Sequence, residues 1–147
     1  MKVVIQVVDN ASVSVNGELI SNIDNGYLLL VGIDQFDDEE IVSKIAQKIV
    51  NMRINPDENG KTNLSIFDVK GEILSISQFT LCAQVDKRRP SFSHAAKPEI
   101  AKPLFEKFNQ VLKDNGLNVK QGVFGEEMIV KLTNHGPFTI VLTEKDV

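Results

Sequence analysis

The chain has 147 residues, of which 42% are hydrophobic and 24% charged, and its formal net charge at pH 7 is −4. This length and composition predict one globular domain, residues 1–147, and the charge argues against a general binder of DNA or RNA, since such binding depends on clustered Lys and Arg at phosphates. No stretch approaches the roughly 18 apolar residues of a membrane span, and the single cysteine, Cys82, cannot form an internal disulfide, so we expect a cytoplasmic protein with no membrane partner.

Four strands are predicted in the first 33 residues. Lys2–Val8 is rich in β-branched residues. Ala11–Val15 and Glu18–Ile23 flank Asn16-Gly17, a dipeptide typical of a type I′ turn, so we expect a hairpin there. Tyr27–Ile33 is a continuous apolar run bounded by glycine, which is typical of a strand buried on both faces.

A first helix is predicted from Asp37 to Arg53. Its apolar residues recur at helical spacing and share one face: Ile41, Val42, Ile45, Ile49 and Val50. Asp37 and Glu40 have the spacing of a capping box, which predicts that the helix begins at this point.

A second central strand and a second helix are predicted after a turn marked by Asn55-Pro56-Asp57 and Asn59-Gly60. The strand is Glu72–Leu81. The helix runs from about Pro98 to Asn115 and ends at Gly116, with Pro103 predicting a kink or a late start. Its apolar face consists of Ile100, Leu104, Phe105, Phe108, Val111 and Leu112.

Two further strands, Glu127–Asn134 and Phe138–Leu142, are predicted near the C-terminus, separated by His135-Gly136-Pro137. No repeat, low-complexity tract or linker interrupts the chain. The pattern as a whole predicts an α/β protein of the mixed α+β type, a single-domain β-sheet or barrel with two main helices.

Ser77, Gln78, Phe79 and Thr80, in the predicted second central strand, are candidate catalytic residues. Hydroxyl and amide groups at the end of a rigid strand can present hydrogen-bond donors to a ligand. The plain alternative is strand alternation, with Ser77 and Phe79 on one face of the sheet and Gln78 and Thr80 on the other. The residues alone leave both interpretations open.

Gly136-Pro137 is the second candidate segment. Because proline cannot donate a hydrogen bond to a sheet ladder, this dipeptide either forms an ordinary turn or holds a specific backbone shape that can include a cis bond. Ordinary turns are far commoner, so the specific shape needs support from elsewhere in the sequence.

Cys82, His94 and His135 raise the hypothesis of a Cys-His hydrolase, in which an imidazole activates a thiolate. The apolar neighbours of Cys82 favour an inert, buried thiol instead. No Cys and His cluster has the spacing of a metal site, so we expect neither a metal nor another cofactor. Lys87-Arg88-Arg89 is the best local candidate for an RNA contact, and a solvated charged surface is the default alternative.

Five motifs occur along the chain: IQVVDNASVSVNGE, NPDENGKTNLS, SQFTL, RRPSFS and VKLTNHGPFT. In this order and spacing they resemble the D-aminoacyl-tRNA deacylase family, the D-tyrosyl-tRNA deacylases. SQFTL together with the NxGPxT pattern is far more specific to that family than either half. The resemblance implies the family's fold and a proofreading hydrolase that releases D-amino acids from tRNA.

The resemblance also implies a homodimer in which Gly136-Pro137 of one subunit enters the active site of the other. In that family the Gly-Pro bond is cis and its two carbonyls point into the pocket, where an L side chain would collide and a D side chain points away. Glycine has no side chain to reject, so activity on glycyl-tRNA, including glycine mischarged on tRNA-Ala, is implied as well.

The same resemblance assigns roles to the other candidates. Backbone N–H groups near Phe79 and Thr80 would polarise the ester carbonyl, and Ser77-Gln78 would shape the pocket. Either the Thr80 side chain or, as the family favours, the ribose 2′-hydroxyl of the tRNA would drive the chemistry. Arg88 or Arg89 would contact the acceptor end of the aminoacyl-tRNA. A Cys-dependent hydrolase of small esters and a non-catalytic dimeric RNA- or ligand-binding module are the competing hypotheses.

Overall fold

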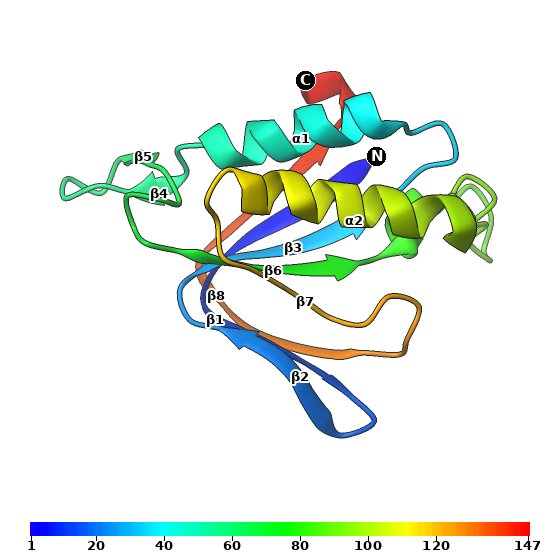
Figure 1. Cartoon of the computed structure of the whole chain (residues 1–147), viewed down its shortest axis with the longest axis horizontal. Coiled ribbons are helices and arrows are strands. Elements are labelled where there is room, and N and C mark those ends of the chain that lie inside the picture. The colour runs from blue at the N-terminus through cyan, green and yellow to red at the C-terminus, as the bar shows by residue number, and fades with distance from the viewer.

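A six-stranded sheet with two helices across one face makes up the fold (Figure 1). The computed structural model describes residues 1–147. The strands are β1 (Lys2–Val15), β2 (Glu18–Ile23), β3 (Gly26–Gly32), β4 (Asn55–Pro56), β5 (Thr62–Leu64), β6 (Glu72–Ser77), β7 (Val119–Gln121) and β8 (Ile129–Thr143). The helices are α1 (Glu39–Asn51) and α2 (Pro98–Asp114), with short 3-10 helices η1 (Phe79–Cys82) and η2 (Glu144–Asp146). This mixed arrangement confirms the predicted fold class.

β1 is hydrogen-bonded along both edges. β8 runs antiparallel along one edge for nearly the whole length of β1. On the other edge, β3 pairs with Lys2–Val8 and β2 with Ala11–Val15. The two segments that the sequence predicts separately are therefore one strand, because β8 still pairs with Asn10 between them.

β3, β6 and β7 are parallel, so the chain crosses over the sheet between them. α1 lies in the first crossover and α2 in the second. On the far side, β2 approaches β7: Ser21 Oγ donates to the carbonyl of Gln121, and Lys120 Nζ donates to the carbonyl of Asn22 at 2.8 Å. These contacts curl the sheet toward a closed barrel.

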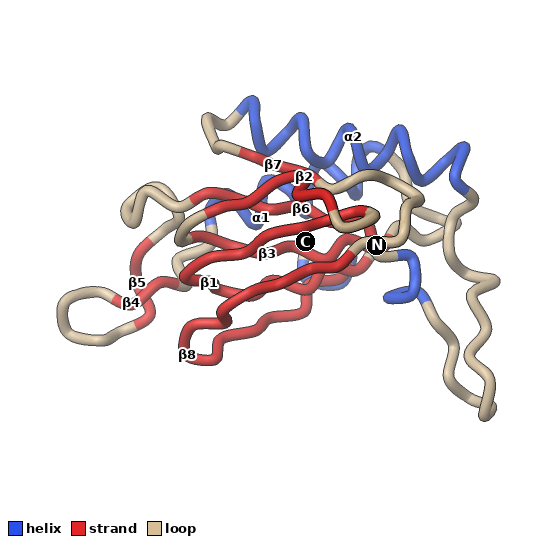
Figure 2. Tube along the Cα trace, turned by 90° about the horizontal axis from the view of Figure 1, so that it is seen from below, coloured by secondary structure: helices blue, strands red, loops and turns tan.

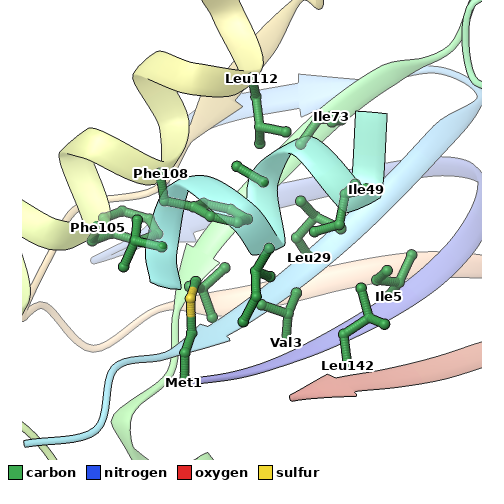
Figure 3. Close-up of a cluster of buried hydrophobic side chains, with 14 of the residues drawn as sticks. Met1, Val3, Ile5, Leu29, Ile49, Ile73, Phe105, Phe108, Leu112 and Leu142 are labelled. Atoms are coloured by element: carbon green, nitrogen blue, oxygen red, sulfur yellow. The ribbon is translucent and has the colours of Figure 1, made fainter. Parts of the chain in front are cut away.

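Each face of the curled sheet has a hydrophobic core. In the larger core, Ile5 and Leu29 from the sheet face Ile49 of α1 and Phe108 of α2 (Figure 3). The smaller core lies inside the curve of the sheet and consists of Val8, Ala11, Val13, Ile23, Leu28, Leu74 and Ile76. β3 contributes to both cores, which confirms the prediction of a strand buried on both faces.

The turn at Asn16-Gly17 lies where the sequence predicts it, whereas the turn predicted from Asn55 begins only at Asp57, because Asn55 and Pro56 pair with β5 as β4. Asn16 and Gly17 join β1 to β2 with φ of 51° and 78°, both positive as a type I′ turn requires. Between β4 and β5, the Asp57 carboxylate accepts hydrogen bonds from the N–H groups of Lys61 and Asn59 at 3.0 and 2.9 Å. These bonds, that from Lys61 above all, lower the pKa of Asp57.

α1 begins later than the predicted capping box places it. Asp38 is the N-cap residue, and its Oδ1 accepts from the N–H of Ile41 at 2.9 Å. Asp37 faces inward instead: Oδ1 lies 2.6 Å from the ammonium of Met1, and Oδ2 accepts from the N–H of Asp34 at 2.6 Å. The predicted capping box is wrong because Asp37 is engaged by the buried ammonium.

α2 runs without interruption from Pro98 to Asp114, so the predicted late start is wrong. Pro98 occupies the first helical position, where an N–H would have no helical partner. Pro103 removes one hydrogen bond, but Phe105 and Phe108 on the buried face pack into the larger core on the C-terminal side of it. Gly116, with φ of +94°, ends the helix as predicted.

Tyr27 is completely buried in the larger core, where its Oη accepts a hydrogen bond from Asn55 Nδ2 at 2.7 Å. Burial raises the pKa of Tyr27 to about 12, and the bond from Asn55 opposes this in part. A neutral phenol is therefore part of the folded state well above the pH at which an exposed tyrosine ionises.

Tyr27 is the one tyrosine in a chain without tryptophan, so its phenolate absorbance can be followed alone. We expect ionisation near pH 10 in the unfolded chain and near pH 12 in the folded chain. Because the unfolded state ionises first, the free energy of unfolding should fall as pH rises between these values. Tyr27→Phe should remove that decline. Phenolate absorbance near pH 10 in a chain that keeps its folded circular dichroism would contradict this.

Candidate functional site

A cavity of about 590 Å³ opens where β6 ends. Its mostly hydrophobic wall comes from the ends of β3 and β6, from η1, from the start of α2 and from the turn before β8. Ser77 and Gln78 are polar groups in this wall, and Glu126 is its one charged residue. Because β3 and β6 are parallel, their carboxyl ends reach the same edge of the sheet, where α/β proteins commonly bind ligands.

β6 ends at Ser77, before the predicted strand end at Leu81. Gln78 leaves the strand with φ −143° and ψ 80°, and Phe79–Cys82 form η1. η1 packs closely over β3, since a Cβ on Gly32 would lie 2.9 Å from Leu81 Cβ of η1 and 3.0 Å from the carbonyl oxygen of Gln78. The alternation considered for these residues therefore stops at Ser77, because a helical turn replaces the strand.

The amide N–H groups of Phe79 and Thr80 have no hydrogen-bond acceptor in the chain. They open η1, and the first N–H groups of a helix lack partners within it. Both residues are exposed, with 54% of Phe79 accessible. Two adjacent free donors of this kind can bind a developing oxyanion.

The Thr80 hydroxyl accepts a hydrogen bond from Gln78 Nε2. No carboxylate or imidazole is hydrogen-bonded to this hydroxyl, so the chain supplies it with no general base. The Gln78 side chain thus fixes the position of the Thr80 hydroxyl without activating it.

Phe79 and Phe92 form an aromatic edge of the cavity, with ring centroids 5.3 Å apart and ring planes at 73°. Phe92 follows a loop that is closed at its base by two backbone hydrogen bonds between Gln84 and Ser91, at 2.8 and 2.9 Å. The loop between η1 and α2 projects away from the sheet (Figure 2) and carries Lys87-Arg88-Arg89, all exposed. Arg88 and Arg89 are therefore near the aromatic edge in sequence but outside the cavity wall.

Gly136 and Pro137 lie in a bulge of β8. The prediction of two separate strands is wrong: β8 is continuous, and His135–Phe138 lie opposite the single residue Val7 of β1. β8 pairs with β1 both before and after these residues, so the extra residues form a bulge. The Gly136-Pro137 bond is cis, both residues are exposed, and neither lines the cavity of its own subunit.

Side-chain contacts hold the base of this bulge. Asn134 Oδ1 accepts from the N–H of Phe138, and Asn134 Nδ2 donates to Thr139 Oγ1, both at 3.1 Å. His135 Nδ1 lies 2.8 Å from Asp9 Oδ1 on β1. Because the ladder between β8 and β1 is interrupted here, the N–H of Phe138 uses the Asn134 side chain as its acceptor.

Cys82 and His94 both line a second cavity, of about 750 Å³, beside the N-terminus. Burial raises the pKa of the Cys82 thiol, and the charge of Asp34 raises it further, so the reactive thiolate is disfavoured. The His94 ring contacts Gln84 Nε2, with 3.0 Å between that atom and Nδ1. His135 lies in the bulge instead, so the three residues of the Cys-His hypothesis do not come together.

Phe124 and Glu126 also line the first cavity, although no motif in the sequence marks them as site residues. They lie in a turn in which the N–H of Glu126 donates to the carbonyl of Val123 at 3.3 Å and Gly125 has φ of +81°. Gly125 is the sequence feature that indicates this turn, because glycine often marks the point where a chain turns.

No three or more His, Cys, Asp or Glu side chains lie close enough together to hold a metal ion. None of the helices combines the length and the hydrophobicity that crossing a membrane requires.

The chain is similar to known proteins over nearly its whole length. The family described as D-Tyr-tRNA(Tyr) deacylase matches residues 4–143. A D-aminoacyl-tRNA deacylase of Lactobacillus acidophilus is 54% identical over 143 residues, covering 97% of this chain and 99% of that protein. A protein of the same name from Thermosipho africanus is 48% identical over 148 residues, covering 100% and 99%.

Two solved structures are also similar. One, named c-Myc DNA Unwinding Element Binding Protein, has a TM-score of 0.91 at 39% identity, covering 97% of this chain and 98% of its own. The other, a probable eukaryotic D-amino acid tRNA deacylase, has a TM-score of 0.82 at 15% identity, covering 96% and 97%. At that identity the second structure supports the fold alone.

Asn134→Ala should destabilise the bulge, because it leaves the N–H of Phe138 without an acceptor. We expect the free energy of unfolding in urea to fall by about 1–2 kcal/mol. Lys131→Ala, an exposed change on the same strand, is the matched control and should shift the midpoint little. Equal effects of the two substitutions would mean that the Asn134 side chain does not support the bulge.

Proposed function

The chain belongs to the D-Tyr-tRNA(Tyr) deacylase family, and on that premise we infer that it hydrolyses the ester bond of D-aminoacyl-tRNA, releasing D-amino acid and free tRNA. It is accordingly a hydrolase acting on carboxylic ester bonds. The observation that carries the mechanism is the pair of free N–H groups at Phe79 and Thr80, beside an apolar cavity and within the SQFTL segment.

In the proposed reaction the backbone, rather than a side-chain nucleophile, stabilises the transition state. Water adds to the ester carbonyl, negative charge develops on the carbonyl oxygen, and the N–H groups of Phe79 and Thr80 bind that charge. The bond to the ribose oxygen then breaks, and that oxygen takes a proton. Ser77-Gln78 shape the cavity, and the neighbouring ribose 2′-hydroxyl assists the attack because no base contacts the Thr80 hydroxyl. This sequence of steps calls for no metal or cofactor.

Chirality is read, in this proposal, by Gly136-Pro137 of a second copy of the chain. Rigid backbone carbonyls placed beside the substrate Cα would exclude an L side chain and admit a D side chain. Support comes from position: the dipeptide is exposed on its bulge and lies outside the cavity of its own subunit. The same filter cannot reject glycine, so glycyl-tRNA, including glycine on tRNA-Ala, is a second substrate.

The homodimer that this filter requires is supported by the surface of β8. β8 pairs with β1 alone, so its other edge has free backbone donors and acceptors. The exposed side chains of this strand include Ile129 at 59%, Leu132 at 36% and Val141 at 55%. A long, partly apolar free edge is the kind of surface that pairs with another chain.

The acceptor end of the tRNA is proposed to meet the projecting loop of Lys87-Arg88-Arg89. Arg88 and Arg89 would contact phosphates there, which positions the substrate without reading its sequence. Phe92, at the foot of the loop, lines the cavity, so a tRNA held by the arginines would have its terminal ester near η1. A tRNA substrate and a free thiol are consistent with the cytoplasm as the site of action.

Two competing functions remain open to experiment. A Cys-dependent esterase is disfavoured by the raised pKa of Cys82 and by its position outside the first cavity. A binding module without catalysis, of the kind that the name of the similar c-Myc DNA Unwinding Element Binding Protein describes, would bind nucleic acid but release no amino acid.

The first test is hydrolysis of matched D-tyrosyl-, L-tyrosyl- and glycyl-tRNA by the purified protein. We expect the D and glycyl esters to be cleaved and the L ester to be spared, because the proposed filter acts on the L side chain alone. Cys82→Ser should leave all three rates nearly unchanged. Loss of activity in that variant would favour the thiol esterase, and binding of all three tRNAs without release would favour the binding module.

A mixing experiment tests the shared site. Ala95→Trp should fill the cavity of its own subunit, and Pro137→Trp should obstruct the cavity of its partner, so each homodimer should be inactive. A one-to-one mixture of the two variants, in which subunits pair at random, should recover about a quarter of wild-type activity. Half of the dimers are then heterodimers, and each heterodimer has one intact site out of two. Both variants must first give folded dimers in solution. No recovery from such dimers would show that each subunit is complete by itself.

A further inference from the structure

Glu126 is the one charged residue lining the 590 Å³ cavity, whose other lining residues are mostly hydrophobic. Its carboxylate forms no ion pair within the chain. The Glu126 carboxylate accepts no hydrogen bond within the chain either. Gln78, another polar residue of the wall, does have a side-chain partner, the Thr80 hydroxyl. Glu126 is exposed, so an unpartnered negative charge lies at the solvent-facing edge of the cavity.

The position of Glu126 is fixed by the turn that carries it. Gly125, with φ of +81°, lets the chain turn between Phe124 and Glu126. Phe124 packs against Phe105 of α2, with ring centroids 6.1 Å apart, and so anchors the turn to a rigid helix. Because the turn is anchored, Glu126 is held at the edge of the cavity, where its side chain is exposed to solvent.

A lone carboxylate beside an apolar surface favours a cationic partner. Every aminoacyl ester carries one positive charge next to the scissile carbonyl, the α-ammonium group, whatever its side chain. We propose that Glu126 binds the α-ammonium of the aminoacyl group and thereby restricts the enzyme to substrates with a free amine, as opposed to N-acylated or peptidyl esters. This inference rests on the proposed function and names a specificity-determining residue for the same site.

The role of Glu126 is binding rather than chemistry. Its carboxylate orients the substrate Cα. The ester carbonyl then faces the N–H groups of η1, and the position that an L side chain would occupy faces the proposed filter. Loss of the charge should weaken binding of free-amine substrates and leave blocked substrates unaffected. The neighbouring Glu127 is also exposed but does not line the cavity, which makes it a matched control.

The test compares D-tyrosyl-tRNA with N-acetyl-D-tyrosyl-tRNA at pH 6.5, where the amine is protonated. For the full chain and for Glu126→Gln and Glu127→Gln, kcat/KM is measured on both esters. In Glu126→Gln we expect roughly a fivefold loss on the free-amine ester, mainly in KM, and no change on the acetylated ester. Glu127→Gln should change neither value, and added salt should reduce the difference between wild type and Glu126→Gln.

Other outcomes overturn the inference in distinguishable ways. Equal losses on both esters in Glu126→Gln would indicate a structural role for the residue. An effect that depends on the charge of the amino-acid side chain, comparing D-lysyl- with D-aspartyl-tRNA, but not on acetylation would mean that Glu126 faces that side chain. No cleavage of D-tyrosyl-tRNA by the wild-type protein would refute the proposed function itself, and this inference with it.

Discussion

Hydrogen bonding along both edges of β1 is the constraint on which the rest of the molecule depends. One edge takes β3 and then β2, and the other takes β8 over nearly the full length of β1. Because β1 is shared, any extra residue in β8 has to leave the ladder, and His135–Phe138 do so as the bulge. The same strand directs β2 toward β7, which curls the sheet and separates its two cores.

The parallel half of the sheet determines where the cavity lies. β3 and β6 end together, Gly32 leaves room for η1 to turn across the end of β3, and that turn frees the N–H groups of Phe79 and Thr80. α2 and the turn at Gly125 complete the wall. The result is a cavity at one end of the sheet and an exposed dipeptide on an edge strand elsewhere, both determined by strand pairing.

Much of this could be predicted from residue patterns, and the failures have physical causes. The hairpin at Asn16-Gly17 was predictable because turn chemistry is local, and both helices because their apolar faces repeat. The end of β6 was not predictable. Phe79 and Leu81 suit a strand, and the packing of η1 on Gly32, which ends the strand early, is a tertiary contact. The role of Asp37 was not predictable either, because its buried ammonium partner, Met1, is remote in the sequence and adjacent only in the fold. Glu126 had no pattern of its own, since a cavity wall assembled from five segments has no period in the sequence.

The separation of Gly136-Pro137 from the cavity of its own subunit has a consequence for the cell. If two copies complete one site, the accuracy of the enzyme obeys mass action, and a lone subunit has a pocket without the groups that check its contents. Selection would then act on the abundance of the protein and on the strength of its self-association as strongly as on its pocket. A mutation far from any substrate, on the free edge of β8, could therefore lower translational fidelity while leaving every substrate contact within the subunit intact.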